Sequence, residues 1–201
     1  MVIAKEIPDS ATILRGVIIL ADLVLFNSEQ LFPKKITIQR LVDVDLEIAA
    51  QVIRESFATV ADDFDLTIDN CPTNGAFTQA KHLKIDLEKG NQLFGLYLGK
   101  KMIGFFELVY NEGNQATLEK VAIIPPERGK KYGEFILDKV REIAKNDHIE
   151  RIDIGIIKEN IRLKEWYQRN GYQIVRSQNF AHLPFEVLYM QLNLNNEVSS
   201  G

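Results

Sequence analysis

The stretch that decides the fold is LEKVAIIPPERGKKYGEFILDK, from Leu118 to Lys139. It predicts a strand, a short basic turn and then an amphipathic helix. The turn carries three basic residues and two glycines: Arg128, Lys130, Lys131, Gly129 and Gly133. The start of a helix leaves about four backbone N–H groups without intrahelical partners, and the aligned peptide dipoles add a partial positive charge there. Such a turn suits a pyrophosphate, although an ordinary strand-to-helix loop with solvated lysines fits these residues equally well.

Composition limits the class of protein. The chain has 201 residues, which fits one domain with an appendage and is ample for a hydrophobic core. Apolar residues make up 46% and charged residues 26%, both ordinary globular values. The net charge of −4 argues against a general nucleic-acid binder, which would carry a strongly basic face. It leaves room for a local basic site for an anionic ligand.

Cysteine and histidine usage argues against a metal site. Cys71 is the only cysteine, so an intramolecular disulfide and a cysteine-built metal site are both excluded. The three histidines, His82, His148 and His182, are scattered and lack the i, i+4 spacing of a helical metal site. The absence of cysteine pairs suits a reducing cytoplasm, where we expect the protein to act.

Residues 1–35 form an N-terminal extension whose role the sequence does not reveal. Its most apolar run is VIILADLVLF, Val17 to Phe26, with Arg15 before it and Asp22 inside it. The run is too short for a transmembrane helix, and the acidic residues near the start argue against a signal peptide. We therefore expect no membrane partner. The run is interpreted as an extra helix or strand packed on the domain or on a second copy of it; a segment without a functional role is the alternative.

Residues 36–194 alternate between strand and helix patterns, with a short tail at 195–201. Besides the opening stretch, strands are expected at 36–42, 93–98, 102–110, 151–157, 172–176 and 186–194, and helices after Asp43, at 77–88 and at 160–169. Asp43 is expected to cap the first helix. This order predicts a mixed α/β layer fold.

Four aspartates, Asp62, Asp63, Asp65 and Asp69, follow the first predicted helix. One interpretation is a solvated helix end and loop. The other is an acidic region that attracts a cationic substrate.

A second motif, NIRLKEWYQRNGY from Asn160 to Tyr172, decides the interpretation. Together with Val121 to Gly133, it resembles the GNAT superfamily of acyl-CoA-dependent N-acetyltransferases. The first motif is similar to the family's fourth strand and pyrophosphate loop, Arg/Gln-x-x-Gly-x-Gly/Ala. The second has the family's Asn, its Tyr seven residues later, and its Gly-aromatic pair. The resemblance covers Ile36 to Leu194 and implies a central mixed, mostly antiparallel sheet of six to seven strands flanked by about four helices.

One position departs from the family pattern, because Lys131 stands where the loop usually has its first glycine. A right-handed helical backbone there would cost a lysine little. A positive φ or a close phosphate approach would strain it and weaken cofactor binding.

The resemblance implies direct transfer of an acetyl group from acetyl-CoA, as co-substrate, to a primary amine without a metal. The backbone of Val121, Ala122 and Ile123 would pair with the pantetheine arm like an added strand, and one N–H there would polarise the thioester carbonyl. Asn160 would cap its helix and also bond the pantetheine arm. The pyrophosphate would be held by Arg128, Gly129, Lys130, Lys131, Tyr132 and Gly133.

Tyr167 lies where the family keeps a tyrosine that protonates the departing thiolate. Some members use a glutamate at the position of Glu119 as a base acting through water; we expect Glu119 to share a strand face with Val121. An exposed strand carboxylate is the alternative for Glu119, and Glu107 on the preceding strand is the reserve candidate. Trp166 is interpreted as core packing.

The acceptor itself is not readable from these residues. The resemblance implies that the first two helices and the last hairpin line the acceptor side. Here they carry the acidic cluster, Phe77 and Phe185, which favours a small cationic amine over a protein terminus. A protein or peptide N-acetyltransferase and a non-catalytic acyl-CoA sensor on the same fold remain alternatives. A nucleotide-phosphate hydrolase is excluded by the lack of a G-x-x-x-x-G-K-[ST] sequence. A homodimer is possible, through residues 1–35 or the closing strands.

Overall fold

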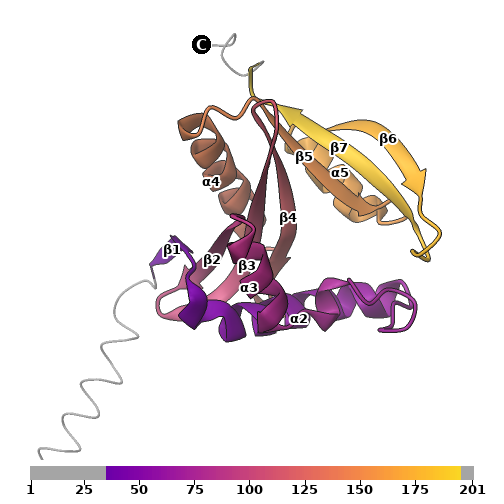
Figure 1. Ribbon diagram of the computed structural model, residues 1–201, viewed down its shortest axis with the longest axis horizontal. Coiled ribbons are helices and arrows are strands. Elements are labelled where there is room, and N and C mark those ends of the chain that lie inside the picture. The colour runs from indigo at the N-terminus through magenta and orange to yellow at the C-terminus, as the bar shows by residue number, and fades with distance from the viewer. Residues whose placement is uncertain (1–34, 196–201) are drawn as a thin grey trace, which may run out of the picture. The chain divides into compact units, whose positions relative to one another are not determined.

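The computed structural model describes residues 35–195, so the predictions for the apolar run of the N-terminal extension and for nearly all of the C-terminal tail lie outside the described residues. The described chain forms one seven-stranded sheet in the order β1-β2-β3-β4-β5-β7-β6 (Figure 1). Only the β4–β5 pair is parallel. The strands are β1 Ile36–Arg40, β2 Gln92–Leu98, β3 Lys101–Asn111, β4 Gln115–Ile123, β5 Arg151–Ile157, β6 Gln173–Asn179 and β7 Glu186–Asn193. The predicted mixed, mostly antiparallel sheet is confirmed.

Four α-helices accompany the sheet in the described part of the chain, as the resemblance implied. They are α2 Leu46–Asp63, α3 Ala80–Glu88, α4 Tyr132–Asn146 and α5 Ile161–Arg169. Figure 1 shows α2 and α3 crossing the strands at one end of the sheet and α4 lying beside β4. None of these helices is long and apolar enough to cross a membrane.

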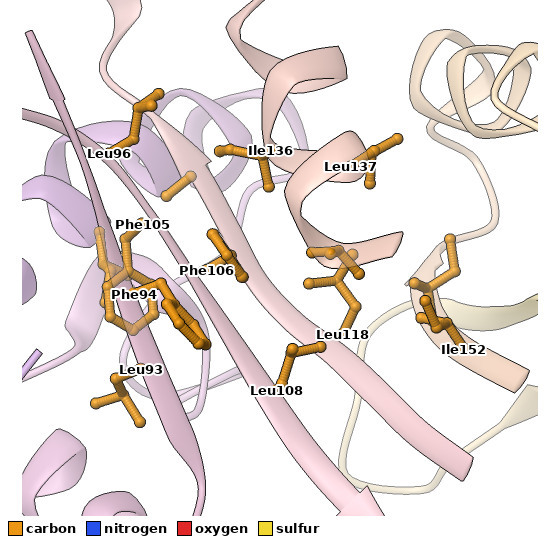
Figure 2. Close-up of a cluster of buried hydrophobic side chains, with 14 of the residues drawn as sticks. Leu93, Phe94, Leu96, Phe105, Phe106, Leu108, Leu118, Ile136, Leu137 and Ile152 are labelled. Atoms are coloured by element: carbon orange, nitrogen blue, oxygen red, sulfur yellow. The ribbon is translucent and has the colours of Figure 1, made fainter. Parts of the chain in front are cut away.

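One part of the main core lies between α4 and the central strands. Phe94 of β2 stacks on Phe106 of β3 with ring centroids 4.8 Å apart. Figure 2 shows Ile136 and Leu137 of α4 above Phe106 and its neighbours. Ile136 and Leu137 are at most 1% exposed. Because side chains alternate along a strand, Phe105 and Glu107 of β3 point to the opposite face, toward α2 and α3.

The first helix begins differently from the prediction. Asp43 does not cap it, because the chain enters through a 3₁₀ turn, η1 Asp43–Asp45, and α2 starts at Leu46. The carboxylate that reaches back is that of Asp45, which accepts a hydrogen bond from the Val42 N–H at 3.4 Å.

The second helix is shorter than predicted. Residues Gly75–Phe77 form a separate 3₁₀ turn, η2, capped by the Asn74 side chain, and Thr78 is extended. The α3 helix therefore begins at Ala80 and ends at Glu88.

Candidate active site

Strands β4 and β5 pair at one end only. Gln115–Thr117 pair with Arg151–Asp153, and beyond Thr117 the two strands no longer pair with each other. The Arg151 guanidinium fixes the closed end by bonding Gln115 and, at 2.9 Å, Asp153. From Leu118 to Ile123 the β5-facing side of β4 therefore has no strand partner within the described residues. An extended ligand can pair with such a strand side.

The three residues predicted to pair with the pantetheine arm, Val121, Ala122 and Ile123, lie in this unpaired part of β4. On its other side β4 stays bonded to β3, and the strand leaves the sheet where the Ile124 N–H donates to Ile103 O at 3.0 Å.

A β-bulge interrupts β4 just before these residues. Glu119 pairs with Glu107 and Ala122 with Phe105, so Lys120 and Val121 together stand opposite one residue of β3. Lys120 has φ 50°, a left-handed conformation that costs a non-glycine residue about 1–2 kcal/mol. The bulge also corrects one prediction. Cross-strand partners share a face, so Glu119 shares its face with Ala122 and not with Val121.

The two candidate bases have different surroundings. The Glu107 side chain is fully buried, and its two oxygens accept hydrogen bonds from Asn91 Nδ2 at 2.6 Å and Lys120 Nζ at 2.5 Å. The Glu119 side chain is 46% exposed and lies 3.9 Å from Lys120 Nζ. Burial raises the pKa of Glu119; Lys120 opposes this rise, and the nearby carboxylates Glu107 and Asp86 add to it. Glu119 is therefore the carboxylate available to take up a proton.

The loop between β4 and α4 presents a row of free backbone donors. After the 3₁₀ turn η3 Pro125–Glu127, Gly129 has φ 75° and Lys131 has φ 63°. The first N–H of α4 with a backbone acceptor is that of Phe135, which donates to Lys131 O at 3.1 Å. Within residues 35–195, the N–H groups of residues 129–134 donate no hydrogen bond. With the helix dipole behind them, these groups are placed to bind an anion.

The basic side chains of this loop do not all point to that site. The Arg128 guanidinium donates to Ile123 O at 3.0 Å, Thr59 Oγ1 at 2.9 Å and Ser56 O at 2.6 Å. It ties the loop to α2 and to the end of β4, a role that the sequence motif did not reveal. Lys130 is exposed and pairs with Glu127 at 2.8 Å. Lys131 is exposed, and its ammonium has no ion pair among the described residues.

Lys131 answers the question that the sequence left open. It is the N-cap residue of α4 and has a left-handed backbone, so the strained alternative holds.

Gly129 also needs its positive φ, but a side chain there would meet nothing within 4 Å. At Gly133 a Cβ would lie 2.7 Å from Trp166 Cζ2, so this glycine allows the packing of Trp166 as well as any ligand approach. Trp166 is partly buried against the core, as predicted.

Tyr167 is positioned by both ends of α5. The Asn160 side chain caps the helix by accepting from the Leu163 N–H at 3.1 Å, which confirms the predicted cap. At the other end Gly171 has φ 89°, and the Tyr172 N–H donates to Tyr167 O at 3.1 Å, completing a Schellman motif. This turn packs the Tyr172 ring edge-on against Tyr167, 5.1 Å between centroids.

The Tyr167 side chain is almost fully buried, with 4% of its surface exposed. Burial raises the pKa of Tyr167 above its ordinary value. Its phenol therefore stays protonated at neutral pH and is able to donate a proton.

The predicted acceptor-side residues form two groups. The four aspartates of the 62–69 cluster are exposed, as a solvated helix end would be. Phe185, from the β6–β7 connection, packs instead on a small buried cluster that includes Leu66 and Ile157, so it joins the loop after α2 to the end of β5. Phe77 is partly buried in η2. Among the described residues, no group of three His, Cys, Asp or Glu side chains is placed to hold a metal ion.

Solved structures share this architecture. The ribosomal-protein-S18-alanine N-acetyltransferase from Escherichia coli is 15% identical, with a TM-score of 0.65 over 80% of this chain and 94% of that chain. The PaiA N-acetyltransferase from Thermoplasma acidophilum in complex with coenzyme A is 20% identical, with a TM-score of 0.63 over 79% and 99%. A chimeric spermidine N-acetyltransferase SpeG from Vibrio cholerae and hSSAT is 15% identical, with a TM-score of 0.63 over 82% and 98%. At these identities the likeness shows the fold alone.

The family follows from the sequence match. The model of the acetyltransferase (GNAT) family matches residues 62–172, which is more than half of the chain and includes β4, the 128–133 loop and α5. The unpaired side of β4, the free N–H groups that follow it and the buried tyrosine of α5 all lie inside this match. The chain belongs to the GNAT family of acetyltransferases.

Proposed function

We propose that this protein transfers an acetyl group from acetyl-CoA directly to a primary amine of a small molecule. One observation carries the proposal: the unpaired side of β4 leads directly into the free N–H groups of residues 129–134. A long ligand with an amide-bearing arm and a pyrophosphate is complementary to a strand side followed by an anion site.

The described residues fit acetyl-CoA as co-substrate. Val121, Ala122 and Ile123 offer backbone groups to the pantetheine arm. Asn160 caps α5 shortly after β5, the strand on the other side of the opening. The N–H groups of residues 129–134 and the exposed Lys131 would hold the pyrophosphate. When bound, acetyl-CoA supplies an acetyl group activated as a thioester.

Two residues of the chain handle the protons. An alkyl ammonium with a pKa of about 10.4 must lose a proton before it can attack. Glu119, partly exposed beside the bulge, would accept that proton directly or through one water. As the new C–N bond forms and the C–S bond breaks, the Tyr167 phenol would give its proton to the departing sulfur. The second proton, which the nitrogen loses as the amide forms, would then restore the phenol.

The acceptor that we favour is a small cationic amine. Three carboxylates, Asp86, Glu107 and Glu119, surround one lysine, Lys120, on the α3 side of β4. Further aspartates stand exposed at the end of α2, and a field of one sign attracts the opposite charge. The similar structures include enzymes named for spermidine and for a protein alanine, so a protein or peptide terminus is the second candidate. A cytoplasmic location and a homodimer remain predictions.

Calorimetric titration with acetyl-CoA, followed by turnover on a panel of amines, tests the proposal. The panel holds a polyamine, simple diamines and a peptide with an N-terminal alanine. We expect wild type and Tyr167→Phe to bind acetyl-CoA equally, while the variant loses turnover by about 10²–10⁴-fold. Tyr110→Phe is the control. The Tyr110 hydroxyl bonds Asp147 near the turn that joins β3 to β4, outside the unpaired part of β4, so its loss should leave turnover unchanged.

Each alternative function has its own result. Tight binding without turnover on any amine would favour the non-catalytic sensor. Turnover on the peptide alone would favour a protein acetyltransferase. The absence of binding at millimolar acetyl-CoA would overturn the proposal.

A further inference from the structure

A buried carboxylate on β3 explains the lysine at the β4 bulge. Glu107 is fully buried on the face that α3 covers, and a buried charge needs partners. Asn91, in the connection from α3 to β2, donates to one carboxylate oxygen and Lys120 to the other. Lys120 also donates to Asp86 Oδ2 of α3 at 2.9 Å. One ammonium therefore joins β4, β3 and α3.

This network accounts for a backbone that lysine does not prefer. Glycine would adopt the φ of 50° at residue 120 without strain. Glycine, however, would leave Glu107 and Asp86 without their shared cation. Residues in such conformations persist only where their surroundings hold them, and here two carboxylates hold the Lys120 ammonium.

The same ammonium faces the candidate base. Glu119 is the cross-strand partner of Glu107, and its Oε2 lies 3.9 Å from Lys120 Nζ. That separation is longer than a hydrogen bond, so Lys120 acts on Glu119 as a nearby charge and leaves its oxygens free. We propose that Lys120 is a positioning residue for the acetyl transfer: held by Glu107 and Asp86, it fixes the bulge beside the open strand and sets the protonation of Glu119.

The charged groups that act on Glu119 are two lysines and two carboxylates. Burial raises its pKa and Lys120 is the largest opposing influence, followed by the smaller effects of Glu107, Asp86 and Lys89. Desolvation disfavours the Lys120 ammonium, but Glu107 and Asp86 outweigh it and the pKa of Lys120 is raised. Lys120 thus stays charged at any working pH. This inference rests on the proposed function for its meaning, although the link between Lys120 and Glu119 can be measured without turnover.

Carbon-13 NMR of glutamate side-chain carboxyls measures that link directly. The Glu119 resonance is assigned by its loss in Glu119→Gln. In Lys120→Met we expect the Glu119 midpoint to rise by about one pH unit, the size expected for one charge about 4 Å away and partly screened by water. Lys120→Arg should return the midpoint toward that of wild type.

Lys89→Met is the matched control. Lys89 also neighbours Asp86, at 3.6 Å, but its side chain is 65% exposed. Its removal should move the Glu119 midpoint by less than a third of the Lys120 shift, because an exposed charge is screened. Equal shifts in the two variants would show a general charge effect and overturn the proposal.

A second pair of variants covers the case in which Lys120→Met does not fold. Glu107→Gln removes the buried charge, and Glu107→Gln with Lys120→Met then removes the ammonium without leaving that charge unpaired. The Glu119 midpoint should be higher in the double variant than in Glu107→Gln alone. An unchanged midpoint would overturn the proposal.

Activity separates this inference from the proposed function. If wild type acetylates amines, the acidic limb of kcat/KM should move in Lys120→Met by the same amount as the NMR midpoint, and an unmoved limb contradicts the role of Lys120. If wild type neither binds acetyl-CoA nor turns over, the proposed function fails, while the NMR result still decides the link.

Discussion

Two lysines near the two ends of the same site have the same unusual backbone but opposite surroundings. Lys120, at the bulge of β4, and Lys131, at the start of α4, have φ of 50° and 63°. The Lys120 ammonium is bound by Glu107 and Asp86 inside the protein. The Lys131 side chain is exposed and has no ion pair among the described residues.

The difference shows how backbone strain that the fold itself compensates can be distinguished from backbone strain at a ligand-binding site. At the bulge, internal ion pairs and hydrogen bonds offset the left-handed backbone, so the strain serves the fold. At the loop nothing in the described chain offsets it, and the N–H groups of residues 129–134 are also free. Strain without an internal partner is typical of sites where a ligand supplies the missing interaction.

The largest effect should come from breaking the network at the bulge. Glu107→Ala leaves the Lys120 ammonium facing a cavity, and removing one partner of a buried ion pair costs about 3–5 kcal/mol. Urea unfolding measures the loss. Glu107→Gln should cost clearly less, because the amide keeps the shape and can still accept a hydrogen bond. Equal, small losses in both variants would mean that the network contributes little.

Substitution of Arg128 tests how far the loop between β4 and α4 depends on partners inside the protein. Lys131 has no ion pair among the described residues, but Arg128 in the same loop has three hydrogen-bond partners. Arg128→Met removes three hydrogen bonds to Ser56, Thr59 and Ile123, and we expect a loss of about 2 kcal/mol in unfolding free energy. Acetyl-CoA affinity should fall by less than tenfold, since the guanidinium is already committed to α2 and β4. Arg128→Lys, which keeps the charge but not the three-way geometry, is the control. A loss of affinity without a loss of stability would make Arg128 a phosphate ligand instead.

The sequence predicted the fold and the helix cap at Asn160, and the reasons for its errors are physical. The free N–H groups and the cap at Asn160 follow from local chemistry, so the loop and α5 were predictable. The bulge could not be predicted, because nothing in LEKVA indicates a left-handed backbone at the lysine. That conformation depends on Glu107 and Asp86, which are distant from Lys120 in sequence. The same holds for Arg128, whose partners at Ser56 and Thr59 lie some seventy residues earlier.

Glycine substitutions at Lys131 and Lys120 compare how much each lysine side chain contributes to stability. Lys131→Gly relieves the strain of the left-handed backbone but raises the conformational entropy of the unfolded chain. These effects oppose each other, so the unfolding free energy should change by about 1 kcal/mol or less. Acetyl-CoA affinity should fall a few-fold, and less so at high salt. Lys120→Gly relieves the same strain yet should destabilise the protein strongly, because Glu107 loses its cation. Similar stability changes at both positions would remove the contrast between them.

Glu119 should give the smallest effect, and its sign depends on pH. Because its pKa is raised in the folded protein, its contribution to stability is present below the unfolded value of about 4.3 and is lost as pH rises through the folded value. Glutamine does not titrate. The urea midpoint of Glu119→Gln, relative to wild type, should therefore increase as the pH rises above about 4 and level off once the pH exceeds the folded pKa.

A difference that stays constant across this range would contradict the raised pKa and, with it, the fitness of Glu119 as a base. The predicted result would show a carboxylate that costs the fold stability at neutral pH. Its neighbour Glu107 is buried, and both of its oxygens accept hydrogen bonds from the fold. Of the two carboxylates, the one that the fold does not need is the one that the chemistry would use.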